Sequence, residues 1–167
     1  MGGKGRVLLV LRHAKAVQEP GLRDEDRGLT KRGMHDATAA GETIREAGLV
    51  PDRVLCSAAL RTRQTWQQVG TALGPAAGQA KVSYEPGLYD AGADALLEAV
   101  RHGPDTAGTM LLVGHNPASQ ELVVDLTGRR DLPFPTSALA VVRLPGRWAD
   151  AGPGGGELAR IWTPGPA

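Results

Sequence analysis

Three apolar runs without alternation stand out in the chain, each about as long as a β-strand. They cover residues 7–11, 54–56 and 110–113. Runs of this kind are typical of strands that are buried on both faces, as in a parallel sheet. Together with weaker runs elsewhere, they predict strands at 6–11, 53–57, 81–84, 109–113, 137–144 and 157–162, the last at a sheet edge.

Between these runs, apolar residues recur every three or four positions, which is the period of one helix face. Such a face follows Thr30, a residue suited to a helix N-cap, and consists of Met34, Ala37, Gly41, Ile44 and Gly48. The same period predicts helices at 61–73, 93–101 and 117–126, the last with Pro117 at its first position. The polar stretches at 17–29 and 74–79 indicate loops.

Strands and helices therefore alternate along the chain. This order predicts an α/β fold, a three-layer α/β/α sandwich around a mainly parallel central sheet. No break in composition divides the 167 residues, so a single domain over residues 1–167 is expected.

The composition and the net charge of the chain bear on which molecules the protein is expected to bind. With 41% hydrophobic and 22% charged residues, the chain is expected to fold rather than to be disordered. Its net charge of +1 provides no long-range field for nucleic acid or an anionic membrane. Any anion must therefore be bound by a local cluster, and the pattern indicates no particular oligomeric state.

Cysteine content and targeting signals bear on the compartment. Cys56 is the only cysteine, which excludes an intrachain disulfide, and its place in an apolar run favours a buried structural thiol. No secretory leader and no apolar segment of membrane-spanning length is found in the sequence. We expect a cytoplasmic protein without a membrane partner.

Basic and imidazole side chains follow three of the predicted strands where each strand ends. Arg12 and His13 follow the first strand, Arg61 lies just beyond the second, and His115 follows the run that ends at residue 113. Open α/β sheets bind ligands beyond the carboxyl ends of their strands, so these side chains are expected to converge. Ser57 and Asn116, next to them in the sequence, are candidates for substrate binding.

These residue types suit phosphoryl chemistry. A guanidinium presents a planar fork of donors that matches phosphoryl oxygens. A neutral imidazole can attack phosphorus and hold the group covalently, and a second imidazole can stabilise charge on the transferring oxygens. The two guanidinium groups are expected to lower the pKa of His13, leaving that ring neutral near pH 7.

Other chemistries lack their signatures. The sequence has no H-x-x-x-H, C-x-x-C or carboxylate–histidine spacing for a catalytic metal, and arginines beside the site would repel a cation. It also has no G-x-x-x-x-G-K-[ST] loop and no G-x-S-x-G elbow. We therefore predict no metal and no cofactor.

Five short motifs occur in a characteristic order, and as a set they resemble the histidine phosphatase superfamily, which includes the cofactor-dependent phosphoglycerate mutases. The closest resemblance is to the small SixA-like phosphohistidine phosphatases. The motifs are Leu11-Arg12-His13-Ala14-Lys15-Ala16, residues 27–33, residues 57–65, Leu88-Tyr89 and Val113-Gly114-His115-Asn116-Pro117.

The resemblance implies a phosphoglycerate mutase-like fold and a metal-independent two-step hydrolysis. His13 would be phosphorylated, Arg12 and Arg61 would clamp the phosphoryl oxygens, and His115 would complete the pocket. Water would then release phosphate from His13. The chain departs from the usual Arg-His-Gly motif at Ala14, a change that the SixA-like branch often tolerates.

The general acid is left open by the sequence. Glu85 and Asp90 flank Leu88-Tyr89, while the run at 24–26 (Asp24, Glu25, Asp26) precedes Arg27. Spacing does not distinguish these carboxylates, and a phosphohistidine or acyl phosphate needs little acid assistance, so an acid is not required.

The sequence leaves three interpretations of the function open, which differ in the molecule that the pocket accepts and in whether the site is catalytic. The short segment between Tyr84 and Thr109 holds only a loop and one helix, which leaves the pocket uncovered and favours a phosphohistidine side chain of another protein. A small phosphorylated molecule, such as a sugar phosphate or a nucleotide, is the alternative. A non-catalytic phosphate-binding module is the third, and the complete set of two histidines and two arginines argues against it.

Overall fold

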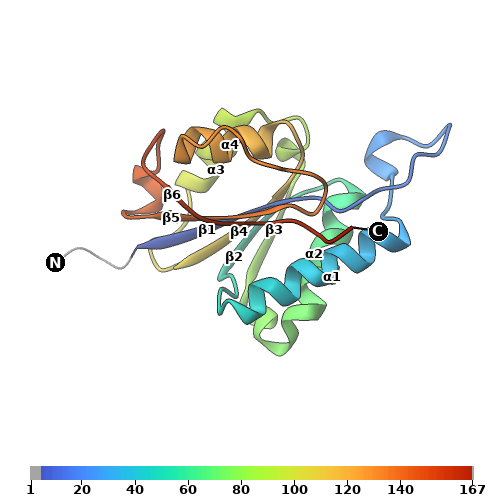
Figure 1. Ribbon diagram of the computed structural model, residues 1–167, viewed down its shortest axis with the longest axis horizontal. Helices are drawn as coiled ribbons and strands as arrows, with labels where there is room; N and C mark the ends of the chain where they lie inside the picture. The colour runs from blue at the N-terminus through green and yellow to red at the C-terminus, as the bar shows by residue number, and fades with distance from the viewer. Residues whose placement is uncertain (1–4, 167) are drawn as a thin grey trace.

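The computed structural model describes residues 5–166, which form a six-stranded sheet with helices on both faces (Figure 1). The strand order is β3-β2-β4-β1-β5-β6. The strands are β1 (Arg6–Arg12), β2 (Arg53–Ser57), β3 (Lys81–Glu85), β4 (Thr109–Gly114), β5 (Leu139–Leu144) and β6 (Glu157–Trp162).

The prediction of a mainly parallel sheet is confirmed. β3, β2, β4 and β1 pair in parallel, whereas β5 runs antiparallel to both β1 and β6. The apolar runs that predicted doubly buried strands form the central strands β1, β2 and β4, and β6 is an edge strand, as expected.

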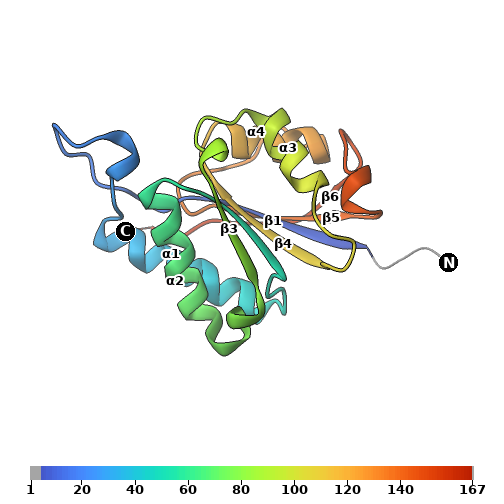
Figure 2. The same cartoon turned by 180° about the vertical axis from the view of Figure 1, so that it is seen from behind.

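Four α-helices cover the two faces of the sheet. Helices α1 and α2 pack together on one face, and α3 and α4 lie on the other (Figures 1 and 2). Their bounds are α1 (Lys31–Glu46), α2 (Leu60–Leu73), α3 (Ala93–Arg101) and α4 (Ala118–Thr127). Short 3₁₀ turns occur at Asp24–Asp26, Gly74–Gln79, Pro86–Leu88 and Trp148–Asp150. The three-layer α/β/α architecture is therefore confirmed.

The central strands are buried on both faces, and their side chains alternate between two apolar cores. In β1, Leu8 and Val10 belong to the core under α3 and α4, while Leu9 and Leu11 belong to the core under α1 and α2. Cys56 lies in the second core, and burial raises the pKa of its thiol to about 12. The expected structural thiol is confirmed.

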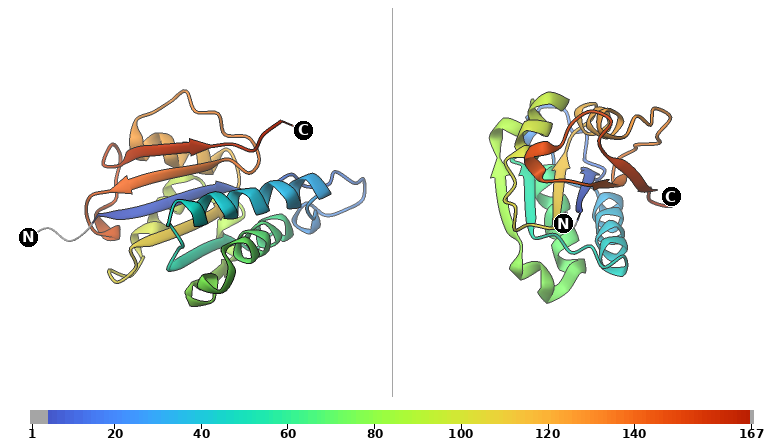
Figure 3. Two further views of the ribbon diagram at one scale, coloured as in Figure 1. Left: turned by 60° about the horizontal axis from the view of Figure 1, so that its bottom comes forward. Right: turned by 90° about the vertical axis from the view of Figure 1, so that its left-hand side faces the viewer.

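The predicted apolar face of the first helix is wrong at Met34. Ala37, Gly41 and Ile44 are buried, but Met34 is 39% exposed. The first turn of α1 extends past the end of the sheet (Figure 3), which agrees with the exposure of Met34. Gly48 follows the helix in a left-handed turn, the conformation in which a glycine commonly ends a helix. In the middle of α1, Gly41 permits a close approach to α2, since a Cβ there would lie 2.8 Å from the Val69 carbonyl oxygen.

Smaller differences concern element ends and the loops. Helix α4 begins at Ala118, with Pro117 as the residue before it, and the stretches predicted as loops contain the first two 3₁₀ turns. Among residues 5–166, none of the helices combines the length and the apolar character that a membrane crossing requires.

Candidate active site

Three strand ends bring the site together at one edge of the sheet. Arg12 pairs with Gly114 across β1 and β4, and Cys56 pairs with Val113 across β2 and β4. The residues that follow these pairs, His13, Ser57 and His115, therefore leave the sheet side by side. The centroids of the His13 and His115 rings lie 5.4 Å apart.

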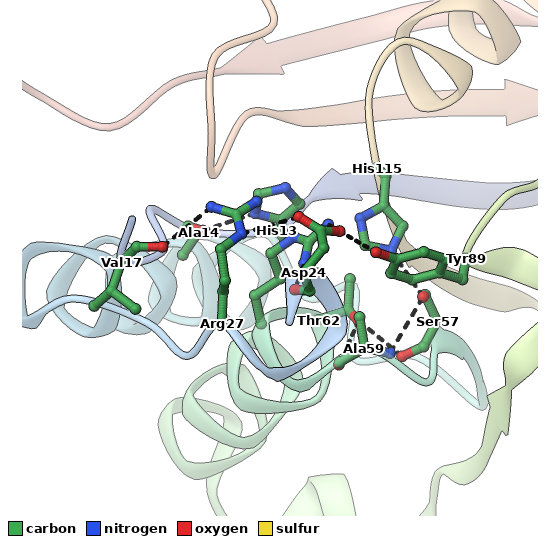
Figure 4. Close-up of polar contacts among 11 residues, drawn as sticks. His13, Ala14, Val17, Asp24, Arg27, Ser57, Ala59, Thr62, Tyr89 and His115 are labelled. Atoms are coloured by element: carbon green, nitrogen blue, oxygen red, sulfur yellow. Dashed lines mark hydrogen bonds and ion pairs between the residues drawn. The ribbon is translucent and has the colours of Figure 1, made fainter. Parts of the chain in front are cut away.

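The His13 ring has a defined tautomer. It is buried, with 8% exposure, and its Nδ1 lies 2.8 Å from the carbonyl oxygen of Ala14. Because a carbonyl oxygen only accepts, Nδ1 carries the proton and donates it to Ala14 (Figure 4). Nε2 is then the nitrogen with a free lone pair, as a nucleophile requires.

The pKa of His13 is lowered to about 3, first by burial and then by the charges of Arg61, His115 and Arg12. The direction agrees with the sequence-based expectation. The leading cause differs, because removal from water outweighs the neighbouring guanidinium groups. The ring is therefore neutral at physiological pH.

His115 lies beside His13 at the end of β4. Its Nε2 lies 2.8 Å from the hydroxyl of Ser57, and the Tyr89 ring meets it edge-on at 5.4 Å between centroids. Burial, followed by the charge of Arg61, lowers its pKa to about 4. Nδ1 is buried and has no hydrogen-bond partner within the described chain. Ser57 thus orients His115 through its hydroxyl.

Arg12 is held by the segment that precedes β5. Its Nη1 donates to the carbonyl oxygen of Phe134 at 3.0 Å, and the same oxygen accepts from Asn116 Nδ2 at 3.2 Å. The Asn116 side chain also exchanges hydrogen bonds with Gln120. In this structure the Asn116 side chain therefore connects the loop that contains Phe134 to the start of α4.

Arg61 lies in the first turn of α2 and is 6% exposed. Strand β2 and the start of α2 place Arg61 near both histidines, and its charge lowers the pKa of each ring. Thr65, one turn later, donates to the Arg61 carbonyl at 2.7 Å and accepts from the Ala14 amide at 3.0 Å. It connects the chain after His13 to α2.

The loop after His13 is attached to α1 through the residues of the second motif. Thr30 caps α1 by accepting from the Gly33 amide at 2.9 Å, and the Thr30 amide donates to the Lys15 carbonyl at 2.9 Å. A Cβ at Gly33 would lie 2.2 Å from that carbonyl oxygen. Only glycine permits this close approach two residues from His13.

Sequence reasoning missed a convergence of three side chains on Asp24. Arg61 Nη2 donates to Asp24 Oδ2 at 3.0 Å, Arg27 Nε donates to Oδ1 at 3.0 Å, and the Tyr89 hydroxyl donates to Oδ2 (Figure 4). The Tyr89 hydrogen bond is the first cause that lowers the pKa of Asp24 to about 2, followed by the contacts with Arg61 and Arg27. Arg27 and Tyr89 occur in the motifs, but no spacing selects Asp24 over Glu25 and Asp26.

The other candidate carboxylates have different surroundings. Asp26 and Glu25 contact Arg23, and Glu85 accepts from the Ser83 hydroxyl at 2.5 Å. Asp90 lines a hollow of about 290 Å³ beside His115, whose wall also includes Tyr89 and Glu121. Of the three acid candidates Asp26, Glu85 and Asp90, only Asp90 shares a hollow with one of the site histidines among the described residues.

Metal ligands do not cluster in this part of the molecule. Across the described residues, no group of three His, Cys, Asp or Glu side chains lies close enough to hold a metal ion. The charged side chains nearest the two histidines are the guanidinium groups and Asp24.

Comparison with known proteins assigns the family. Residues 8–96 match the family model of the histidine phosphatase superfamily, branch 1. The chain belongs to this superfamily. An uncharacterised protein of Mycobacterium tuberculosis is 35% identical over 164 residues, which cover 92% of this chain and 99% of the relative.

Solved structures narrow the branch. A candidate phosphohistidine phosphatase SixA from Nakamurella multipartitia is 33% identical, with a TM-score of 0.85 over 98% of this chain and 99% of the other. The protein histidine phosphatase SixA, solved with tungstate, is 25% identical, with a TM-score of 0.76 over 95% and 97%. The expected SixA-like branch is therefore confirmed, and the likeness supports a phosphatase.

The wider fold is shared as well. A phosphoglycerate mutase from Plasmodium falciparum superposes with a TM-score of 0.64 at 13% identity, over 95% of this chain and 91% of that one. The phosphoglycerate mutase-like architecture expected from the sequence is confirmed at the level of fold.

Proposed function

We propose that this protein hydrolyses phosphohistidine side chains of other proteins through a covalent phosphohistidine on His13. The observation that carries the proposal is the hydrogen bond from His13 Nδ1 to the Ala14 carbonyl, which leaves Nε2 as a free nucleophile. The low pKa of His13, about 3, keeps that nucleophile unprotonated at physiological pH.

In the first step, Nε2 attacks phosphorus, the new P–N bond forms, and the bond to the leaving nitrogen breaks with its electron pair. The leaving imidazole departs neutral when its other nitrogen is already protonated. Nδ1 of His13 keeps its proton, so the phosphorylated ring carries a positive charge that the Ala14 carbonyl stabilises. Arg12 and Arg61 neutralise the phosphoryl oxygens.

In the second step, water attacks phosphorus and the P–N bond to His13 breaks, which returns the ring to its neutral form. The proton lost by the water passes to the phosphate product or to solvent. His115 lies 5.4 Å from His13 between ring centroids, and its Nε2 contacts the Ser57 hydroxyl in the free protein. When substrate binds, Nε2 exchanges that hydroxyl for a phosphoryl oxygen and donates a hydrogen bond to it in both steps.

One feature favours a phosphorylated nitrogen over an alkyl phosphate, and a second favours a protein side chain over a small molecule. The nearest carboxylate, Asp24, is ionised, with a pKa of about 2, and therefore holds no proton for a poor leaving group. The hollow of about 290 Å³ beside His115 has room for a side chain, and only the 3₁₀ turn at Pro86–Leu88 and helix α3 lie between β3 and β4.

A panel of substrates tests this proposal. We expect a histidine-phosphorylated peptide to be turned over with a higher kcat/KM than a sugar phosphate, a nucleotide or a serine-phosphorylated peptide. Equal or faster turnover of the sugar phosphate or the nucleotide would assign a small-molecule phosphatase instead. An absence of turnover with every substrate, combined with retained binding of phosphate, would indicate a binding module.

A further inference from the structure

Asp24 occupies donors that a phosphoryl group would use. Both terminal nitrogens of Arg61 bind it, Nη2 through the carboxylate at 3.0 Å and Nη1 through the Asp24 carbonyl at 2.8 Å. Arg27 and Tyr89 donate to the same carboxylate. One anionic group is thus surrounded by donors from the loop after β1, the start of α2 and the turn after β3.

The loop that carries Asp24 is hydrogen-bonded at its base and exposed at its tip. At the base, the Val17 amide donates to the Gly28 carbonyl at 2.9 Å, and the Leu29 amide donates to Gln64 Oε1 at 2.7 Å. Between them, residues 18–24 are exposed to solvent, and the loop extends beyond the end of the sheet (Figure 3). The Asp24 side chain is itself 53% exposed, so water can receive it when it leaves Arg61.

We infer, on the basis of the proposed function, that Asp24 is an internal competitor for the phosphoryl site: in the free protein its carboxylate holds Nη2 of Arg61 and its carbonyl holds Nη1, and a substrate must displace the carboxylate. The arrangement resembles the complex of an arginine with a bound anion, except that the anion is part of the chain. Its pKa of about 2 means that the carboxylate is charged whenever the protein works.

Competition with Asp24 favours ligands that carry more negative charge than one carboxylate. A group that replaces Asp24 must interact with Arg61 and its neighbours more favourably than one carboxylate does, and a phosphoryl dianion meets that condition better than a monoanion. The apparent dissociation constant equals the intrinsic one divided by the fraction of molecules whose site is open. If about a tenth of the molecules are open, removing the competitor tightens oxyanion binding about tenfold.

Binding of tungstate and of inorganic phosphate to the full chain, measured by calorimetry, tests the inference without any need for turnover. We expect Asp24→Asn to bind both oxyanions about tenfold more tightly than the wild type. Asp24→Ala should show a gain of the same direction, and the melting temperature of each variant reports its folding.

Asp26→Asn is the matched control, because it removes the same charge from the same 3₁₀ turn, where the Asp26 carboxylate forms an ion pair with Arg23 at 3.9 Å. Its affinity for the oxyanions should stay within about twofold of the wild type, as expected for a solvated surface charge. Unchanged or weaker binding by Asp24→Asn would overturn the inference, since Asp24 would then only position Arg61. An equal gain in Asp26→Asn would overturn it as well, because the effect would reflect the loop's net charge.

Discussion

The strand-end cluster and the loop of residues 17–29 contribute to one site by different means. His13, Ser57 and His115 follow directly from three central strands, and their relative positions are fixed by the pairing of those strands. Asp24 and Arg27 come from an exposed loop, and they reach the site through side-chain contacts. The first region is held by strand pairing, whereas the second belongs to no strand of the sheet. We therefore assign chemistry to the first region and access to the second.

The largest effect on catalysis is expected from His13→Ala, in the strand-end cluster. Loss of the nucleophile should lower kcat on a histidine-phosphorylated peptide by about 10³-fold or more, as with other covalent catalysts. His35→Ala is the matched control, because His35 is exposed on α1 and should leave kcat unchanged. Wild-type turnover by His13→Ala would remove the nucleophile assignment.

Arg61 belongs to both regions, because its charge lowers the pKa of the two histidines and its guanidinium binds Asp24 in the loop. Arg61→Ala should lower kcat/KM by about 10²–10³-fold, the usual effect of removing a donor that stabilises transferring charge. Its circular dichroism spectrum should match the wild type, because the guanidinium packs at the cleft and not in either apolar core. A loss below tenfold would show that Arg61 does not contact the reacting group. Arg63→Ala, in the same helix turn, is the control.

Gly33 joins the two regions where the loop meets α1. Gly33→Ala should destabilise the fold by about 1–3 kcal/mol, the usual effect of forcing an extra methyl into a packed site, because the added Cβ would lie 2.2 Å from the Lys15 carbonyl oxygen. Chemical denaturation measures the change. Gly87→Ala, where a Cβ meets nothing within 4 Å, should change the stability far less. Equal stabilities of the two variants would contradict the tight contact beside His13.

The pH dependence of stability separates the buried histidines from the exposed loop. The pKa falls from 6.5 to about 3 for His13 and to about 4 for His115. Below pH 6.5 the unfolded chain therefore binds more protons than the folded one, so the free energy of unfolding falls as the pH drops from 6.5 towards 3. Denaturation at pH 7.5, 6 and 5 should show this loss, and His13→Gln should reduce it. The contribution of Asp24 is lost only at lower pH, because its pKa falls from 3.8 to about 2. A stability that stays constant from pH 7.5 to 5 would contradict the buried neutral rings.

The same contrast explains what the sequence could predict. Apolar runs and the residues that end them depend on local pattern, so the strands, the mainly parallel sheet and the clustering of His13 with His115 followed from it. The position of Asp24 depends on how an exposed loop folds back onto Arg61 and Tyr89, and three adjacent carboxylates gave no local signal to choose among them. The exposure of Met34 was not predicted for a related reason. The helical period identifies one face of a helix, but it does not show where the helix extends beyond the sheet that it covers.

Asn116 shows what a motif leaves open about contacts. Its amide binds the Phe134 carbonyl and Gln120 in the folded chain, and the residue also lines the hollow beside His115. The Phe134 carbonyl lies 18 residues away in sequence, so spacing along the chain does not reveal this contact. The substrate contact expected from its place after His115 stays a prediction.

Rapid quenching of the enzyme with a histidine-phosphorylated peptide, followed by peptide mass spectrometry under alkaline conditions, tests the account most directly. The account predicts a phosphoryl group on His13 that appears within one turnover and decays as phosphate is released. It also predicts that His13→Ala gives no such species. Steady turnover without any phosphorylated His13, or a phosphoryl group on His115 instead, would contradict it.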